Sequence, residues 1–316
     1  MWYKKQAELL REELETLLKL LVDTAGLYEL TRKALTGAGR GIFADKPDSL
    51  PWPLLPLMVC ETVSGRFEPA LPAAASIQLL KTAAEVFDDV EDADSPESLS
   101  SRYGPALAVN AATTLLILSE KVLAGLKARG VEDSIIVRIM ESISSYYTTA
   151  CAGQHLDISH TGDLAVTEEL YMKIISLKSA TTAECACYTG ALLGQAGPDS
   201  LDKFARFGHN LGMMSQIVND IQGVTGGKDI IRRKITLPVI YALSQTRGET
   251  YRRLERAFSQ ETETAIQPGQ IKDLLFQCGA VHYSVLRMEL YKQRAAGILA
   301  EMEAGFDTGQ LKQFLE

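Results

Sequence analysis

Helical periodicity along almost the whole chain is the feature that most restricts its fold. Residues 7–22 (AELLREELETLLKLLV) repeat leucines at the spacing of one helix face, with Glu and Arg on the opposite face. Alternating strand patterns bounded by Asn-Gly or Asp-Gly turns are absent from the sequence. The sequence therefore predicts an all-α protein with about ten or more helices. Similar apolar stripes recur at 71–90, 105–128, 132–152, 167–195, 200–223, 236–258 and 270–304.

Glycine and proline clusters separate these stripes, at 37–56, 197–198, 226–227 and 268–269. None of them is a long polar linker, so we expect a single domain over residues 1–316. Runs of small residues inside the stripes, such as Ala73 to Ala75, let helices approach one another closely. The expected architecture is a large helical bundle.

Composition restricts the function more than the fold. The 316 residues carry 32 Lys and Arg against 40 Asp and Glu, and the pI near 5.2 argues against a nucleic-acid partner. The most apolar stretches, such as Thr113–Leu118, are shorter than the ~18 to 20 residues of a membrane span. The N-terminus has no apolar signal core, and five cysteines do not suggest a disulfide framework. We therefore expect a cytoplasmic protein without a transmembrane segment.

An acidic cluster at residues 87–94, Phe-Asp-Asp-Val-Glu-Asp-Ala-Asp, directly follows an apolar stripe. On a helix, Asp88 and Asp92 lie one turn apart on one face, with Asp89 beside them. Ser95-Pro96 indicates that the helix ends there, where the helix dipole disfavours each acid by about 0.3–1 kcal/mol. Oxygen ligands in this position favour a hard divalent cation, Mg²⁺ first. The alternative to a metal site is an acidic surface loop that is hydrated by water.

A second polar group follows a later stripe, where Gln216, Asn219 and Asp220 precede a glycine-rich turn. Carboxylate and amide oxygens followed by cations are typical of a site for a metal ion and a phosphate, although a helix end with a basic loop is the plainer alternative. Lys178 lies among apolar and small residues, so its ammonium reaches either the surface or a polar cavity. The basic run after the turn consists of Lys228, Arg232, Arg233 and Lys234.

Taken in order, these segments resemble the motifs of the polyprenyl synthetase family, the trans-isoprenyl diphosphate synthases, over roughly residues 30–245. Asp88-Asp89-Val90-Glu91-Asp92 matches the first D-D-x-x-D motif in full. Gly153 to Asp157 resembles the family's G-Q-x-x-D segment, and Leu177-Lys178-Ser179 is similar to its Lys-Thr motif. Gln216 to Asp220 resembles the start of its F-Q-x-x-D-D-x-x-D segment. Asp229-Ile230, followed by Lys234 to Pro238, is similar to its D-L…K-x-T-L-P segment.

The resemblance implies a helical bundle of the isoprenoid synthase type around a central prenyl-binding cavity, and a homodimer. It implies a Mg²⁺-dependent prenyltransferase that ionises an allylic prenyl diphosphate. In that role Asp88, Asp89 and Asp92 would bind two Mg²⁺, and Asn219 and Asp220 a third. The residues implied to bind the diphosphate are Lys178, Lys234, Gln216 and Lys81, of which Lys178 and Lys234 would act on the leaving group.

Several positions depart from the family pattern. Its second motif has three aspartates, whereas this chain has Asn219, Asp220 and Gly223, and glycine has no side chain to bind a metal ion. Lys81 stands in place of the phosphate-binding histidine of the isopentenyl diphosphate site, and Trp52-Pro53 in place of an Arg-Pro pair. Arg40 and Lys46 are the remaining basic candidates for that anion.

The ionising half of the family's site is thus kept, and the acceptor half is altered. The acceptor could be isopentenyl diphosphate, an indole on a peptide as in the pheromone-modifying isoprenyl transferases, or the substrate's own double bond as in a class I terpene cyclase. A third alternative is a non-catalytic subunit of a heteromeric prenyl diphosphate synthase. Ala83 and Ala84, small residues shortly before Asp88, indicate room for a chain of C15 or longer.

Overall fold

The computed structural model describes residues 3–37, 41–43, 52–92, 96–259 and 267–316. Within these ranges the regular elements are helices and there is no strand, so the all-α prediction is confirmed. The chain divides into two compact units, which we describe separately. The first comprises residues 1–146, 183–208 and 298–316, and the second comprises 147–182 and 209–297. The single domain expected from the sequence stays a prediction.

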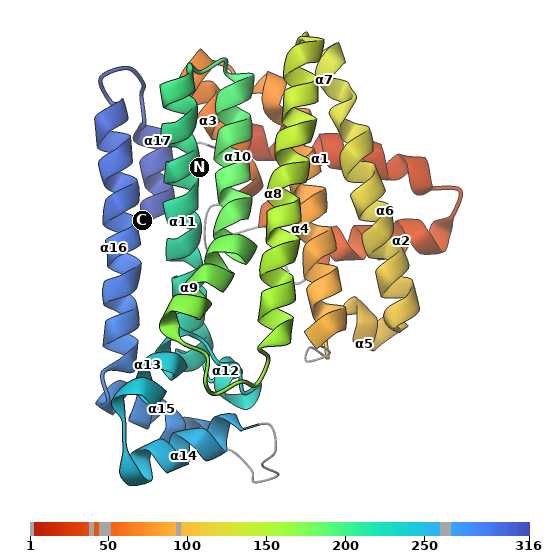
Figure 1. The fold of residues 1–316 in the computed structure, drawn as a ribbon. Coiled ribbons are helices and arrows are strands. Elements are labelled where there is room, and N and C mark those ends of the chain that lie inside the picture. The colour runs from red at the N-terminus through yellow and green to blue at the C-terminus, as the bar shows by residue number, and fades with distance from the viewer. Residues whose placement is uncertain (1–2, 38–40, 44–51, 93–95, 260–266) are drawn as a thin grey trace. The chain divides into compact units, whose positions relative to one another are not determined.

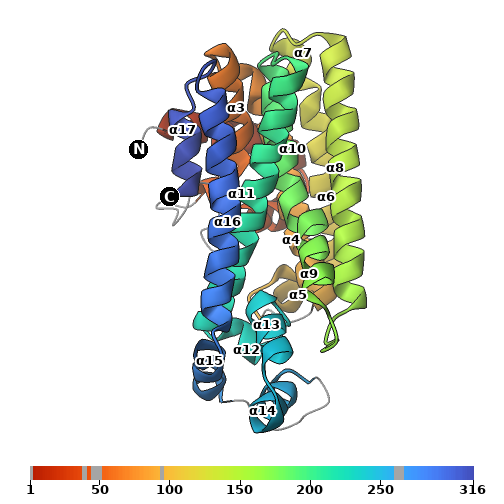
Figure 2. The same ribbon diagram turned by 60° about the vertical axis from the view of Figure 1, so that its left-hand side comes forward.

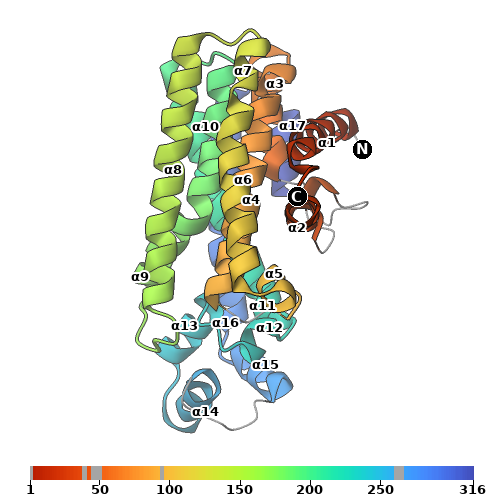
Figure 3. The same ribbon diagram turned by 90° about the vertical axis from the view of Figure 1, so that its right-hand side faces the viewer.

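In the first unit, α4 (Leu71–Asp92) and α6 (Pro105–Leu123) lie side by side (Figures 1 and 3). The alanines of α4 from Ala73 to Ala75 are fully buried, which agrees with the close packing expected from small residues. The remaining helices are α1 (Lys4–Leu18), α2 (Ala25–Thr36), α3 (Leu55–Ser64), α5 (Leu99–Tyr103), α7 (Gly125–Ala128) and α17 (Gly309–Lys312), with parts of α8 (Asp133–Ser159), α10 (Thr181–Leu193), α11 (Pro198–Thr225) and α16 (Ala280–Met302).

Glycines permit two close helix contacts in this unit. A Cβ on Gly190 of α10 would lie 2.5 Å from the carbonyl oxygen of Pro56 in α3. A Cβ on Gly208 of α11 would lie 2.4 Å from the carbonyl oxygen of Ala183 in α10. Side-chain carbons do not approach backbone this closely, so these two helix pairs depend on glycine.

The second unit contains α9 (Glu168–Ile175), the π-helical turn Ser176–Ala180, and parts of α8, α11 and α16. Near the end of α11, the short helices α12 to α15 gather around a buried cluster that includes Val224, Leu254 and Phe258 (Figure 2). These helices are α12 (Lys228–Ile231), α13 (Leu237–Gln245), α14 (Gly248–Phe258) and α15 (Pro268–Gln277).

Two of the expected apolar stripes are each divided between two helices. The stripe at 236–258 forms α13 and α14, and Gly248 between them has a φ of +63°. The stripe at 270–304 is divided at Gly279, whose φ is +79°. Glycine adopts this left-handed conformation without the steric cost that other residues incur. The apolar spacing continues across both breaks, so periodicity alone did not reveal them.

The segment Pro105–Ala128, which contains α6, is long and apolar enough by length and composition to cross a membrane. The expectation that no segment is long enough to span a membrane rested on shorter stretches such as Thr113–Leu118 and did not take this longer segment into account. A single such segment is weak evidence for a membrane span, because the core helix of a soluble protein has the same length and composition.

We expect Gly208→Ala to lower the free energy of unfolding by about 1–3 kcal/mol, because the added methyl group meets backbone that cannot move aside. The matched control is Gly297→Ala in the interior of α16, where nothing lies within 4 Å of the new carbon. There the change should stabilise by about 0.5–1 kcal/mol, the helix preference for alanine. Urea unfolding measures both, and equal effects would contradict the close-packing argument.

Candidate active site

The first acidic cluster lies at the C-terminal end of α4, which ends at Asp92. Asp88, Asp89 and Asp92 are all partly exposed, and Asp88 and Asp92 stand one turn apart. The hydroxyl of Ser100, in α5, donates to the carbonyl oxygen of Asp89 at 3.2 Å, which connects this end of α4 to the next helix. The acidic cluster is therefore helical as far as Asp92, and the predicted helix end at Ser95 lies outside the described residues.

The basic residues predicted to bind the acceptor diphosphate are Lys81, Arg40 and Lys46, and only Lys81 lies among the described residues. The Lys81 ammonium forms an ion pair with Glu85, one turn further along α4. Both side chains are partly exposed, so this contact is of the weak surface type. Arg40 and Lys46 lie outside the described residues. Diphosphate binding by Lys81 stays a prediction.

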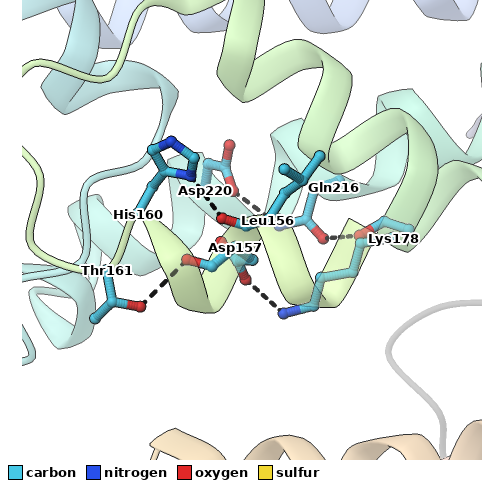
Figure 4. A network of polar contacts seen from close by, with 8 residues as sticks. Leu156, Asp157, His160, Thr161, Lys178, Gln216 and Asp220 are labelled. Atoms are coloured by element: carbon cyan, nitrogen blue, oxygen red, sulfur yellow. Dashed lines mark hydrogen bonds and ion pairs between the residues drawn. The ribbon is translucent and has the colours of Figure 1, made fainter. Parts of the chain in front are cut away.

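Lys178 occupies the π-helical turn in the second unit (Figure 4). A Cβ on Gly153 of α8 would lie only 2.4 Å from the backbone nitrogen of Lys178, so glycine lets this turn approach α8. The carboxylate of Asp157, one turn after Gly153, accepts a hydrogen bond from the Lys178 ammonium at 2.6 Å and forms an ion pair with it. The spacing of Gly153 and Asp157 thus places the backbone and the ammonium of Lys178 on one face of α8. π-Helical turns of this kind are frequent at functional sites.

Asp220, on α11, is 2% exposed, and hydrogen bonds hold both of its carboxylate oxygens. The Tyr171 hydroxyl, on α9, donates to Oδ2 at 2.7 Å, and the Gln216 amide donates to Oδ1 at 2.9 Å. Gln216 in turn accepts a hydrogen bond from the Ser179 hydroxyl at 2.9 Å, next to Lys178. Figure 4 shows Gln216 and Asp220 within this polar network.

Burial raises the pKa of Asp220 to about 7, because the charged carboxylate loses its hydration. The hydrogen bonds from Tyr171 and Gln216 lower the pKa, the charge of Asp229 raises it, and the backbone N–H of Leu237 lowers it. Burial also raises the pKa of Tyr171, with a contribution from Asp220, so this tyrosine remains a hydrogen-bond donor. Tyr171 was not predicted as a site residue, since its position on an apolar helix face is typical of a core residue.

The other positions of the second motif, 219 and 223, are less buried than Asp220. Asn219 is exposed on α11, and Gly223 follows it by one turn on the same face. A Cβ on Gly223 would lie 2.0 Å from Oδ2 of Asp229, in α12. Lys234, which is partly exposed, donates its backbone N–H to the carbonyl oxygen of Asp229 at 2.9 Å. Asp229 and Lys234, separate in the sequence motif, are therefore joined by a backbone hydrogen bond.

The donor set fits a magnesium ion better than it fits a transition metal. Among the residues that the structure describes, no group of three or more His, Cys, Asp and Glu side chains forms a metal-binding cage. Mg²⁺ does not need one, because it is usually held by one or two carboxylates with water and substrate phosphates. In the first unit, Asp88 and Asp92 on one helix face offer oxygens of that kind. In the second unit, the exposed side chain of Asn219 offers one.

The chain matches the polyprenyl synthetase family over residues 52–275, which is more than half of its length. The chain belongs to this family. It is 30% identical to geranylgeranyl diphosphate synthase of Mycobacterium tuberculosis in an alignment covering 55% of this chain and 53% of that protein. With geranylgeranyl diphosphate synthase of Cyanophora paradoxa it shares 26% identity, over 70% of this chain and 76% of that protein. The chain thus spans about half the length of the first relative and three quarters of the second.

The fold is shared with solved structures of the same class. The crystal structure of geranylgeranyl pyrophosphate synthetase from Pyrococcus horikoshii superposes with a TM-score of 0.84 at 22% identity, covering 99% of this chain and 94% of that chain. The isoprenoid synthase fold and the assignment to prenyltransferase enzymes are thereby confirmed for this polyprenyl synthetase family member. The roles of its individual site residues stay predictions.

Tyr171→Phe should lower the free energy of unfolding by about 1–3 kcal/mol at pH 8, because it removes a hydrogen bond from a buried carboxylate that is ionised at that pH. The matched control, Tyr103→Phe, removes an exposed hydroxyl that accepts from Lys33 at 3.0 Å. It should change stability by no more than about 0.5 kcal/mol. Denaturant unfolding monitored by circular dichroism compares the two, and a neutral Tyr171→Phe would show that Asp220 does not depend on this donor.

Proposed function

We propose that this chain is a Mg²⁺-dependent prenyltransferase that ionises an allylic prenyl diphosphate. The observation that carries the proposal is the complete D-D-x-x-D motif at the end of α4, in a member of the polyprenyl synthetase family. Clustered acids at the negative end of a helix destabilise it unless a cation binds there. Asp88, Asp89 and Asp92 would hold two Mg²⁺, and Asn219 and Asp220 a third.

The cationic residues of the second unit would assist departure of the diphosphate. Lys178 and Lys234 would donate charge-assisted hydrogen bonds to its oxygens, and Gln216 would support this contact. In the present structure Asp157 holds the Lys178 ammonium, at a distance of 2.6 Å. An arriving diphosphate would share that ammonium, which is therefore oriented before the substrate binds. When bound, Mg²⁺ supplies the charge that stabilises the leaving diphosphate.

The reaction breaks the bond between the allylic carbon and the diphosphate oxygen, and the electron pair leaves with the diphosphate. The allylic cation then forms a carbon–carbon bond with an electron-rich acceptor, which loses a proton. Water would quench this cation, so the step needs an apolar environment for the prenyl chain. The prenyl-binding cavity of the family would supply it.

A substrate of C15 or longer is favoured by the small residues before the first motif. Ala83 is fully buried in α4, where its methyl side chain adds little bulk, whereas Ala84 is exposed. The acceptor is proposed to be isopentenyl diphosphate, a peptide or the substrate itself, because Lys81 replaces the family's histidine. A terpene cyclase remains the second candidate, and a non-catalytic subunit the third.

We also propose a cytoplasmic homodimer. In the first unit, α6 and α8 expose apolar side chains, among them Ile117 at 59%, Val137 at 55% and Leu107 at 50%. Covering such side chains with a second copy of the chain would remove apolar surface from water. The five cysteines are all free thiols, which suits a reducing compartment.

Asp88→Ala should reduce diphosphate release from farnesyl or geranylgeranyl diphosphate by more than about 10²-fold, the effect of losing a group that stabilises the leaving charge. The release is measured with and without Mg²⁺. Asp202→Ala is the matched control, since Asp202 is an exposed residue of α11 paired with Arg206; it should leave the rate unchanged. Failure of the wild-type protein to release diphosphate with any acceptor would refute the enzyme proposal.

Product analysis separates the candidate reactions. Mass spectrometry of products from C10 to C20 diphosphates, with and without isopentenyl diphosphate, should show chain elongation if that acceptor is used. A hydrocarbon or alcohol formed without any acceptor would instead identify a cyclase. A non-catalytic subunit would form neither product, and Asp88→Ala would then leave its association with a partner subunit intact.

A further inference from the structure

We propose that Tyr283 and Arg287, on α16, are positioning residues that hold Glu168 at the start of α9. That helix carries Tyr171 and leads directly into the π-helical turn that contains Lys178. This inference rests on the proposed Mg²⁺-dependent function, because it concerns how the residues that act on the diphosphate are held in place. It assigns a role to α16, a helix outside all of the sequence motifs.

The Glu168 carboxylate is held by a helix that is distant in the sequence. The Tyr283 hydroxyl lies 2.7 Å from each of the two carboxylate oxygens, so its proton is shared between them. Nη1 of Arg287, one turn further along α16, lies 3.4 Å from Oε1 of Glu168 and forms an ion pair with it. Together these two contacts restrain both the position and the orientation of the carboxylate.

Tyr283 is itself held by an aromatic contact with α13. Its ring stacks on the ring of Tyr241, with the centroids 4.2 Å apart and an angle of 17° between the planes. Figures 1 and 2 show α13 beside the N-terminal end of α16. Burial and the hydrogen bond to Glu168 raise the pKa of Tyr283, so its hydroxyl keeps its proton and remains the donor. One phenol therefore connects α9, α13 and α16.

The connection from Glu168 to the candidate site is one helical turn long. Glu168 and Tyr171 are three positions apart on α9, so their side chains are neighbours on the helix surface. Tyr171 donates a hydrogen bond to the buried Asp220 carboxylate at 2.7 Å. At its other end, α9 continues without interruption into the turn of Lys178. A shift of α9 at Glu168 would therefore displace Tyr171 and Lys178 together.

The contacts of Arg287 favour a positioning role over a general contribution to stability. Its Nε is buried and has no hydrogen-bond partner among the residues that the structure describes. A buried donor without a partner destabilises the folded state. The ion pair with Glu168 joins two partly exposed side chains, and such pairs stabilise a fold only slightly. Arg287 thus adds little to stability while it restricts where the Glu168 carboxylate can lie.

The first test is the rate of Mg²⁺-dependent diphosphate release from farnesyl diphosphate by the full-length chain. Tyr283→Phe keeps the ring that stacks on Tyr241 and removes only the hydroxyl. We expect kcat per folded protein to fall by about 10-fold, because small displacements of catalytic groups slow a reaction strongly. KM should stay within about twofold, the pattern expected when an interaction of the transition state is lost.

Tyr291→Phe is the matched control. Tyr291 lies on the same helix, and both tyrosines pack against the buried cluster that includes Ile175 and Ile217. Removing the Tyr291 hydroxyl should leave kcat and KM unchanged. An equal loss of kcat in the two variants would overturn the specific role of Tyr283.

Substitutions of Glu168 test whether it acts as a pair with Tyr283. Glu168→Gln keeps an oxygen that accepts from the Tyr283 hydroxyl and removes the charge that pairs with Arg287, so it should lose less activity than Glu168→Ala. Glu168→Ala and Tyr283→Phe break the same contact, so the double variant should be little slower than Glu168→Ala alone. Losses that multiply in the double variant would overturn the proposed pair.

Hydrogen exchange measured by mass spectrometry tests the position of α9 without any turnover. In Tyr283→Phe, the amides of residues 168–180 should exchange about 5-fold faster than in the wild type, the effect of one lost hydrogen bond on local opening. The amides of α1, in the first unit, should exchange at the wild-type rate. Unchanged exchange at 168–180 would overturn this inference and leave the proposed function in place.

The two measurements distinguish the failure of this inference from the failure of the proposed function. A wild-type protein that releases no diphosphate would refute the proposed function. The exchange rates of residues 168–180 would still support or overturn the contact by which Tyr283 holds α9.

Discussion

The burial of the Asp220 carboxylate is the constraint on which the second unit depends. An ionised group that is 2% exposed is costly unless hydrogen bonds replace its hydration. Tyr171 from α9, Gln216 from α11 and the backbone N–H of Leu237 at the start of α13 supply them. Three segments distant in the sequence must therefore meet at one carboxylate. Through Gln216 the network continues to Ser179, beside Lys178.

Glycine determines how closely charged groups approach this network. Gly153 admits the backbone of the π-helical turn at Lys178, and Asp157 one turn later holds the ammonium. Gly223 admits the carboxylate of Asp229. In both places a glycine in a helix, which has no side chain, leaves room for a charged residue from another segment. The glycine of the G-Q-x-x-D segment, and the glycine that replaces the last aspartate of the second motif, thus leave space beside polar groups.

The sequence predicted the fold class and the acidic end of α4, because apolar periodicity and local charge are read from neighbouring residues. It did not predict the breaks at Gly248 and Gly279, since a left-handed glycine leaves the apolar spacing intact. Tyr171 was hidden among core positions. The contact of Asp229 with Gly223 depends on how the turn folds back, so the sequence showed only that position 223 lacks a ligand. The metal and diphosphate roles stay predictions.

The most direct test of the account is anomalous diffraction from crystals of the protein grown with Mn²⁺ and an unreactive analogue of an allylic diphosphate. The account predicts manganese at the side-chain oxygens of Asp88 and Asp92 and at Asn219, each ion also contacting the diphosphate. Bound diphosphate without manganese at these residues would contradict it.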